Sequence, residues 1–128
     1  MLVRWKHVVW TGMLGLVIGV IPGAGAAIAS FVAYQQSRIF SKTPELYGTG
    51  HVEGLIAPES ANNGVTSGTL IPLLIIGVPG GATAAIMAVV LEYHGVQFGP
   101  DLFESNPLVG YGPFVAMAIT YVLLGLLI

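Results

Sequence analysis

The chain has 128 residues, of which 55% are hydrophobic and only 8% are charged. Soluble domains carry about 25% charged residues, so this composition could not cover a soluble surface and instead predicts a protein of the lipid bilayer. The net charge of −2, without a basic tract, excludes nucleic acid as a partner. The absence of cysteine excludes disulfides and thiolate sites.

The charged residues leave three long uncharged runs, which extend from Val8 to Ser37, from Ser60 to Leu91 and from Ser105 to Ile128. A spanning helix needs about 20 mainly apolar residues, so each run is long enough for one. We predict an all-α integral membrane protein with a single membrane domain, 1–128. Its predicted parts are a broken helical unit at 8–37, a polar connection at 38–54, a second broken unit at 55–94, a loop at 95–107 and a spanning helix at 108–128.

The first apolar run is interrupted by the sequence Pro22-Gly23-Ala24-Gly25. A proline within a helix costs about 3 kcal/mol, and lipid cannot satisfy the backbone groups that the break frees. A helix that restarts beyond Gly23 presents unpaired amides and about half a positive charge, which an anion can approach closely over glycine. The break is therefore a candidate carboxylate site. Alternatively it is a kink for packing, since Gly12, Gly15, Gly19 and Gly23 form a small-residue face, and both interpretations can hold together.

The topology of this first unit has two alternatives. Each arm is too short to cross a hydrocarbon core of about 30 Å, which favours discontinuous or re-entrant helices over plain spans. In a re-entrant hairpin, Arg4 and Lys6 lie on the same side as Arg38 and Lys42, as the positive-inside rule prefers. In a single broken span, the two pairs face opposite sides. The charge argument favours the hairpin.

The stretch Val78–Val90 repeats the apolar-Pro-Gly pattern of Ile21–Tyr34, and Pro79, Gly80 and Gly81 form its break. Paired Pro/Gly-interrupted segments in corresponding positions are typical of transporter folds. The alternative is chance, because proline and glycine are common in membrane helices.

Polar side chains crowd the start of the second unit, at Asn62, Asn63, Thr66, Ser67 and Thr69. Asn63, Thr66 and Ser67 lie three to four residues apart and share a helical face, so their oxygens could bind Na⁺. Interhelical hydrogen bonding is the alternative role for such residues.

Glu59 follows Pro58 at the edge of the longest uncharged run. Proline followed by an acidic residue is typical of a helix start, which predicts a structural role for Glu59 in a first helical turn. An acidic residue at membrane depth would instead be a proton or cation site.

The remaining candidates for chemistry are weak. His7, His51 and His94 have no ligand spacing, and with Trp5, Trp10 and Tyr93 they are predicted at the membrane interface. Ser30 and Ser60 have no adjacent His/Asp arrangement, so we predict no enzyme activity. We expect no cofactor, and Na⁺ or H⁺ as a coupling ion.

Three stretches together resemble a known family: Gly19–Tyr34, Glu53–Ala85 with its Ala-Pro-Glu-x-Ala-Asn-Asn sequence, and His94–Pro100. They are similar to the large permease subunit of tripartite tricarboxylate transporters, over roughly Gly12 to Phe103. The resemblance is to the later half of that subunit, which is several times longer than this chain. The chain would then be a fragment or half of a longer permease.

The resemblance implies a multi-pass permease of the bacterial cytoplasmic (inner) membrane. Its partners would be a small membrane subunit and a periplasmic solute-binding protein, and its substrates tricarboxylates or related carboxylates, taken up with a cation. Carried over by position, the substrate-binding residues are Pro22, Gly23, Ala24, Gly25, Pro79, Gly80 and Gly81, with Asn62 and Asn63 beside them. The alternative function is a non-transporting membrane scaffold or an inactive truncated permease.

The sequence departs from the family pattern in its second motif. The family's motif runs Pro-Gly-Ser-Ala-Thr-Thr, whereas this chain has Gly81 and Ala84 in place of the serine and the second threonine. Two hydroxyl groups are lost, a change that bears on which carboxylate is bound.

Overall fold

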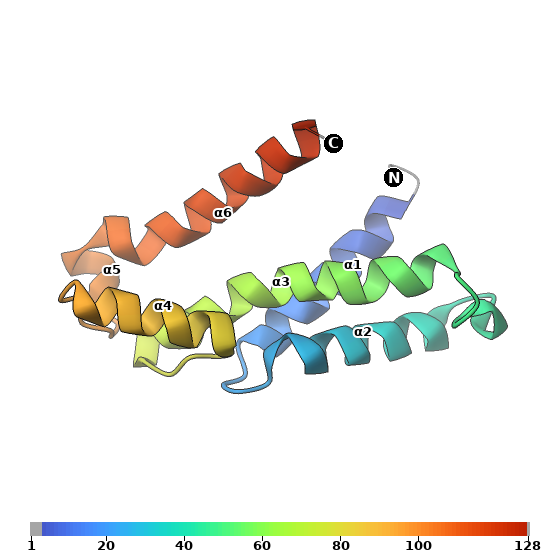
Figure 1. Ribbon diagram of the computed structural model, residues 1–128, viewed down its shortest axis with the longest axis horizontal. Coiled ribbons are helices and arrows are strands. Elements are labelled where there is room, and N and C mark those ends of the chain that lie inside the picture. Colours follow the sequence, from blue (N-terminus) through green and yellow to red (C-terminus); the bar gives the residue numbers. More distant parts are fainter. Residues whose placement is uncertain (1–3, 128) are drawn as a thin grey trace.

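A computed structural model describes residues 4–127, and every regular element within that range is helical (Figure 1). The prediction of an all-α protein is confirmed. The elements in chain order are α1 (Trp5–Gly19), α2 (Gly25–Phe40), the short 3-10 helix η2 (Pro44–Leu46), α3 (Val52–Ile76), α4 (Ala82–Tyr93), α5 (Leu102–Ser105) and α6 (Pro107–Leu127).

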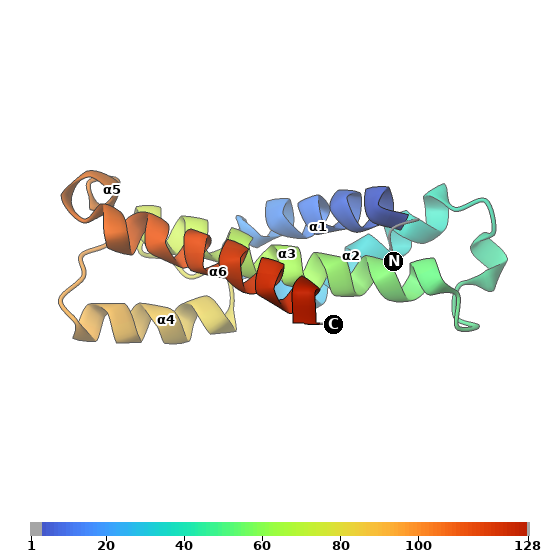
Figure 2. The ribbon, with the colours of Figure 1, turned by 90° about the horizontal axis from the view of Figure 1, so that it is seen from above.

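The first three helices form a bundle in which α1 and α2 run antiparallel and α3 lies along both (Figures 1 and 2). Its core is made mostly of small side chains. The buried residues are Ile18, Ala29, Ala33, Ala61 and Val65. Small side chains allow helix backbones to approach closely, which is the packing typical of membrane helices.

The approach is closest between α1 and α3, where glycines of each helix face the backbone of the other. A Cβ atom added to Gly19 would lie 2.6 Å from the carbonyl oxygen of Val65. Gly64 and Gly68 of α3 likewise face the carbonyls of Gly12 and Leu16. Of the small-residue face predicted on the first helix, Gly15 and Gly19 have no room for a larger residue. A Cβ atom at Gly12 would make ordinary contact, and Gly23 lies beyond the end of α1 with no neighbour within 4 Å, so the predicted face is only partly in use.

The second half of the chain folds around the C-terminal part of α3. That part of α3 extends beyond α1, and α4 and α5 gather around it (Figure 2). Leu70, Leu73 and Leu74 of α3 pack with Ala84 of α4 and Leu102 of α5, and all five are buried. In Figure 1, the distance between α6 and α3 grows toward the C-terminal end of α6.

Among the described residues, α6 is the one helix long and apolar enough to cross a membrane. Only 6% of its apolar window is buried within the chain. The 15 residues of α1 and the 16 of α2 correspond to about 22–24 Å at 1.5 Å per residue, less than a hydrocarbon core of about 30 Å.

One expected helix start is wrong. α3 begins at Val52, with Glu53 in its first turn, so Pro58 and Glu59 lie inside the helix rather than at its start. Proline at position 58 leaves only the carbonyl of Gly54 without its usual intrahelical donor. The packing of α3 on α1 and α2 outweighs that loss, and the helix extends into the stretch expected as a polar connection.

Candidate functional site

The first Pro-Gly segment, residues 20–24, is a turn between α1 and α2. The amide of Ala24 donates to the carbonyl of Ile21 over 3.1 Å, so Pro22 and Gly23 occupy the two central positions. Gly23 has a φ of 77°, which is the conformation that the third residue of a type II turn requires. Proline before glycine is the usual sequence of such a turn, so the local residues explain why the chain reverses here.

The second Pro-Gly segment, residues 77–81, runs back along α3 before α4 begins. Gly77 ends α3 in the left-handed conformation, with a φ of 73°. The amide of Val78 then donates to the carbonyl of Pro72 over 3.4 Å, and the amide of Gly80 to that of Thr69 over 3.4 Å. These two bonds hold the returning chain against α3 and place the start of α4 near Thr69, about two turns before that helix ends.

The two segments meet at the centre of the molecule. A Cβ atom added to Gly80 would lie 2.6 Å from the carbonyl oxygen of Gly19, at the end of α1. A Cβ atom added to Gly81 would lie 3.6 Å from the Cα of Gly25, the first residue of α2. Glycine at position 80 is what permits the approach, whereas a Cβ atom at position 81 would make ordinary van der Waals contacts.

A cavity of ≈230 Å³ lies at this meeting point. It is lined by the first turn of α2, by two threonines of α3 and by the first residues of α4. The lining residues are Ala24, Gly25, Ala26, Ala27, Thr66, Thr69, Gly81, Ala82 and Thr83. No charged side chain belongs to this lining, so a bound ligand would meet backbone groups and threonine hydroxyls.

Two helix N-termini therefore border one cavity. The first amides of a helix have no intrahelical acceptor, and each N-terminus presents about half a positive charge. Neither α2 nor α4 has a side-chain cap on these amides. The site can satisfy the negative charge of a carboxylate with N–H donors and needs no buried cation.

The structure brings together some of the residues predicted for substrate binding and leaves others apart. Ala24, Gly25 and Gly81 line the cavity, and Pro22, Gly23, Pro79 and Gly80 form the adjoining chain. Asn62 and Asn63 are not among the lining residues. Both are exposed on α3, about one turn before Thr66.

The three residues predicted to hold Na⁺ bond to separate acceptors. The side-chain amide of Asn63 donates to the carbonyl of Glu59 over 2.9 Å. The hydroxyl of Thr66 donates to the carbonyl of Asn62 over 3.2 Å, and that of Ser67 to the sulfur of Met117 in α6 over 3.9 Å. Although they share a helical face, only Thr66 lines the cavity.

Two threonines were not assigned to the site from the sequence. Thr69 was noted only as one of several polar residues, and Thr83 was not considered. Their positions in the sequence could have indicated them. Thr69 follows Thr66 by three residues and so lies on the same side of the helix, and Thr83 lies in the first turn after a Pro-Gly break. Within residues 4–127, no group of three His, Asp or Glu side chains could hold a metal ion.

An all-helical chain with an exposed apolar helix, and with two helix N-termini around an uncharged cavity, has the features of membrane transport proteins built on discontinuous helices. The sequence matches the Tripartite tricarboxylate transporter TctA family over residues 2–128, and the chain belongs to that family. The resemblance noted in the sequence is confirmed. This family is one of transporters rather than enzymes.

Two similar proteins come from Agrobacterium vitis. An uncharacterized 52.8 kDa protein in the TAR-I ttuC' 3' region is 38% identical over 115 residues, which cover 90% of this chain and 23% of that protein. An uncharacterized protein in the TAR-II ttuC' 3' region is 37% identical over 113 residues, 88% of this chain and 47% of that protein. The aligned part of the chain thus covers 23% of the first relative and 47% of the second. No solved structure matches it significantly.

Proposed function

We propose that this chain is part of the membrane-embedded permease of a secondary active transporter that takes up tricarboxylates or related carboxylates. The transporter works in the bacterial cytoplasmic membrane, receives its substrate from a periplasmic solute-binding protein and includes a small membrane subunit. Uptake is coupled to Na⁺ or H⁺. Membership of the TctA family supports a membrane location and a tripartite assembly.

The observation that carries this proposal is the convergence of two uncapped helix N-termini on one uncharged cavity. Carboxylates bind such positions in broken-helix transporters. The volume of ≈230 Å³ is below the range of about 300–1,000 Å³ found for drug-sized ligands, which suits a small metabolite. The hydroxyls of Thr66 and Thr69 donate to carbonyls of α3 itself, over 3.2 and 2.9 Å, so the test of this cavity falls on Thr83, the third threonine that lines it.

The hydroxyl of Thr83 gives the sharpest test, because Thr83→Val keeps the shape of the side chain and removes one hydrogen-bond donor. A hydrogen bond to a charged group contributes about 1.5–3 kcal/mol, so the KM for citrate uptake should rise about tenfold to a hundredfold. Uptake is measured with radiolabelled citrate in cells that express the permease with its partner subunits.

Thr120→Val is the matched control for this test. The Thr120 hydroxyl lies on α6 and donates to the carbonyl of Ala116 in its own helix over 2.8 Å. It should leave the KM unchanged. Equal KM values for the two variants and the unmodified permease would exclude the Thr83 hydroxyl from substrate binding and would contradict a carboxylate site in this cavity.

Glu59 provides a second prediction, on ion coupling. It is exposed on α3, two turns before Thr66, and residues 4–127 offer it no ion-pair partner. An unpaired acidic residue in a membrane segment is by default a proton or cation site. Glu59→Gln should therefore abolish uptake driven by an ion gradient while binding of citrate persists.

Glu45→Gln, on η2, removes an exposed carboxylate outside the helical bundle and serves as the control. Uptake driven by an ion gradient in Glu59→Gln at the unmodified rate, with unchanged dependence on Na⁺ and pH, would exclude Glu59 from coupling.

A further inference from the structure

A polar stripe runs along one side of α3 and consists of Glu59, Asn62 and Thr66. The three residues lie three and four positions apart, so they share one face of the helix. Glu59 and Asn62 are exposed, and Thr66 is half-buried. Because α3 is one continuous helix here, the polar stripe is a straight line of side chains about 10 Å long at 1.5 Å per residue.

The neighbouring helices contact α3 on either side of the polar stripe. α1 packs against the side of Ala61. α2 contacts Pro58, whose carbonyl accepts a hydrogen bond from the hydroxyl of Ser30 over 3.1 Å. α6 contacts Asn63, whose carbonyl accepts one from the hydroxyl of Tyr121 over 3.4 Å. At about 100° per residue, the polar stripe falls between positions 58 and 63 and therefore lies between α2 and α6.

The side chains of Glu59 and Asn62 have no partner within residues 4–127. Their backbone carbonyls accept hydrogen bonds inside α3, from Asn63 and Thr66, but the carboxylate and the amide do not take part in those bonds. No ion pair among the described residues involves Glu59. Polar and ionisable side chains at membrane depth face a water-filled space rather than lipid, and they mark ion pathways.

One end of the polar stripe reaches the cavity between the Pro-Gly segments. Thr66 lines that cavity. Its hydroxyl donates to the carbonyl of Asn62, so the hydroxyl oxygen keeps a lone pair for a ligand. From Glu59 to the cavity, an ion would meet a carboxylate, an amide oxygen and a hydroxyl oxygen in turn. Oxygen atoms of these kinds suit a cation, whereas the charge of Glu59 repels a carboxylate.

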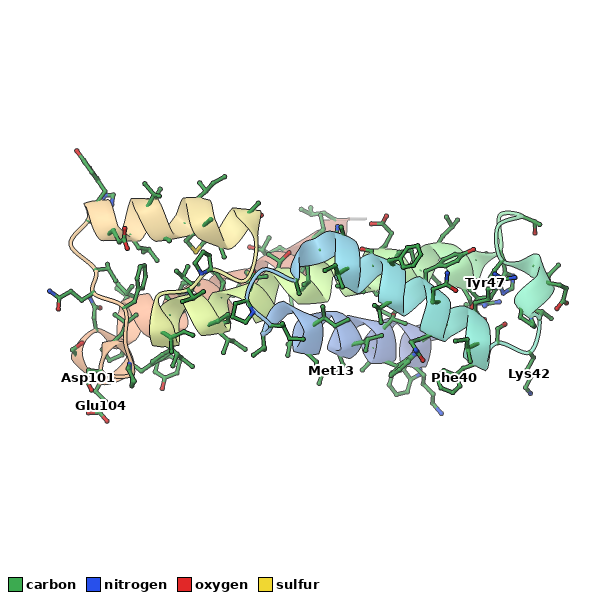
Figure 3. All side chains as sticks on the ribbon, turned by 90° about the horizontal axis from the view of Figure 1, so that it is seen from below. Met13, Phe40, Lys42, Tyr47, Asp101 and Glu104 are labelled. Atoms are coloured by element: carbon green, nitrogen blue, oxygen red, sulfur yellow. The ribbon has the colours of Figure 1, made fainter. Side chains whose placement is uncertain are left out.

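The other end of the polar stripe points toward the basic end of the molecule. Figure 3 shows Phe40, Lys42 and Tyr47 at one end and Asp101 and Glu104 at the opposite end. The four Lys and Arg residues lie around the start of α1 and the end of α2, and α3 begins at the same end (Figure 1). The positive-inside rule places a basic end at the cytoplasmic face. The polar stripe therefore leads from the cytoplasmic face to the cavity.

We propose that the polar stripe is the path along which the coupling cation leaves the cavity for the cytoplasm. The cation moves in water between α2 and α6, and the carboxylate of Glu59 excludes anions from this path. The proposal rests on the coupled uptake and the membrane location of the proposed function, and it adds the route of the ion, on which the carboxylate site has no bearing.

Thiol modification tests this path, because a single cysteine introduced into the cysteine-free chain is its one reactive thiol. Asn62→Cys is expressed in the permease with its partner subunits. Inside-out vesicles are treated with membrane-impermeant methanethiosulfonates that carry either a trimethylammonium or a sulfonate group, and mass spectrometry of the chain measures the rates. The cationic reagent should react faster. Adding Glu59→Gln should lower the ratio of the two rates about tenfold, because the charge attracts one reagent and repels the other.

Ile119→Cys is the matched control for accessibility. Ile119 is 56% exposed and lies on α6 between Met117 and Tyr121, which contact α3. It is therefore at the same level as the polar stripe but on the far side of its own helix, where it faces lipid, and it should stay unmodified. Glu45→Gln is the control for charge and should leave the ratio of rates in Asn62→Cys unchanged.

Three results would overturn the proposal: no modification of Asn62→Cys in inside-out vesicles, modification from the periplasmic face alone, or a ratio of rates that Glu59→Gln does not change. Thr66→Cys serves as a second reporter if Asn62→Cys does not reach the membrane. Slower modification in Na⁺ than in K⁺ at equal ionic strength assigns the path to Na⁺, and equal rates leave H⁺ as the coupling ion. No carboxylate is present, so Thr83→Val, which tests the carboxylate site, should leave all rates unchanged.

Discussion

Gly64→Ala should prevent α1 from packing on α3 and should remove most of the folded protein. A Cβ atom at position 64 would overlap the backbone of Gly12, chiefly its carbonyl oxygen. Overpacking usually costs about 1–3 kcal/mol, and the upper part of that range applies where the obstacle is backbone rather than a flexible side chain. The expected result is a loss of monodisperse protein in detergent and a lower midpoint of thermal unfolding by circular dichroism.

Gly112→Ala is the control for this change. Gly112 is a helical glycine of α6, and nothing lies within 4 Å of a Cβ atom added there. Alanine favours helix over glycine by about 1 kcal/mol, so this variant should fold at least as well as the unmodified chain. If Gly64→Ala unfolded at the same temperature as Gly112→Ala, α1 and α3 would not be in backbone contact.

Gly81→Val should abolish carboxylate uptake while the protein remains folded. Gly81 has a φ of −172°, an extended conformation that valine adopts readily. Its Cβ atom would lie 3.4 Å from Cγ2 of Thr69 and 3.6 Å from the Cα of Gly25, between the two Pro-Gly segments. Two further methyl groups would then occupy the cavity that the proposed substrate needs.

Uptake of radiolabelled citrate and the amount of permease in the membrane are measured on the same cells. Gly125→Val places the same side chain on α6, where a Cβ atom has no neighbour within 4 Å, and should preserve uptake. Normal uptake by Gly81→Val would show that the substrate does not bind between the segments.

The helical class and the family could be predicted from the sequence because both depend on patterns along the chain. Uncharged runs predict apolar helices, and the combination of a Pro-Gly-Ala-Gly stretch with Ala-Pro-Glu-x-Ala-Asn-Asn is specific enough for a family. The small-residue face on the first helix was correct at Gly15 and Gly19, which meet the backbone of α3, but not at Gly23, which lies in the turn beyond α1.

The details of the site could not be predicted because they depend on contacts between distant segments. The sequence does not specify which face of α3 meets the returning chain, so Thr69 and Thr83 were missed and Asn62 and Asn63 were placed beside the cavity. The helix start at Pro58 was wrong for a related reason. Local signals favoured a boundary there, and the packing of α3 against α1 and α2 carries the helix through the proline.

The antiparallel arrangement of α1 and α2 bears on how the chain enters a membrane during synthesis. Both helices have their charged residues at the same end, with Arg4 and Lys6 at the start of α1 and Arg38 and Lys42 at the end of α2 and beyond it. The residues from Val8 to Ser37 carry no charge. A hairpin of this kind can insert with the Pro22–Gly23 turn leading, and no charged side chain has to be translocated across the hydrocarbon core.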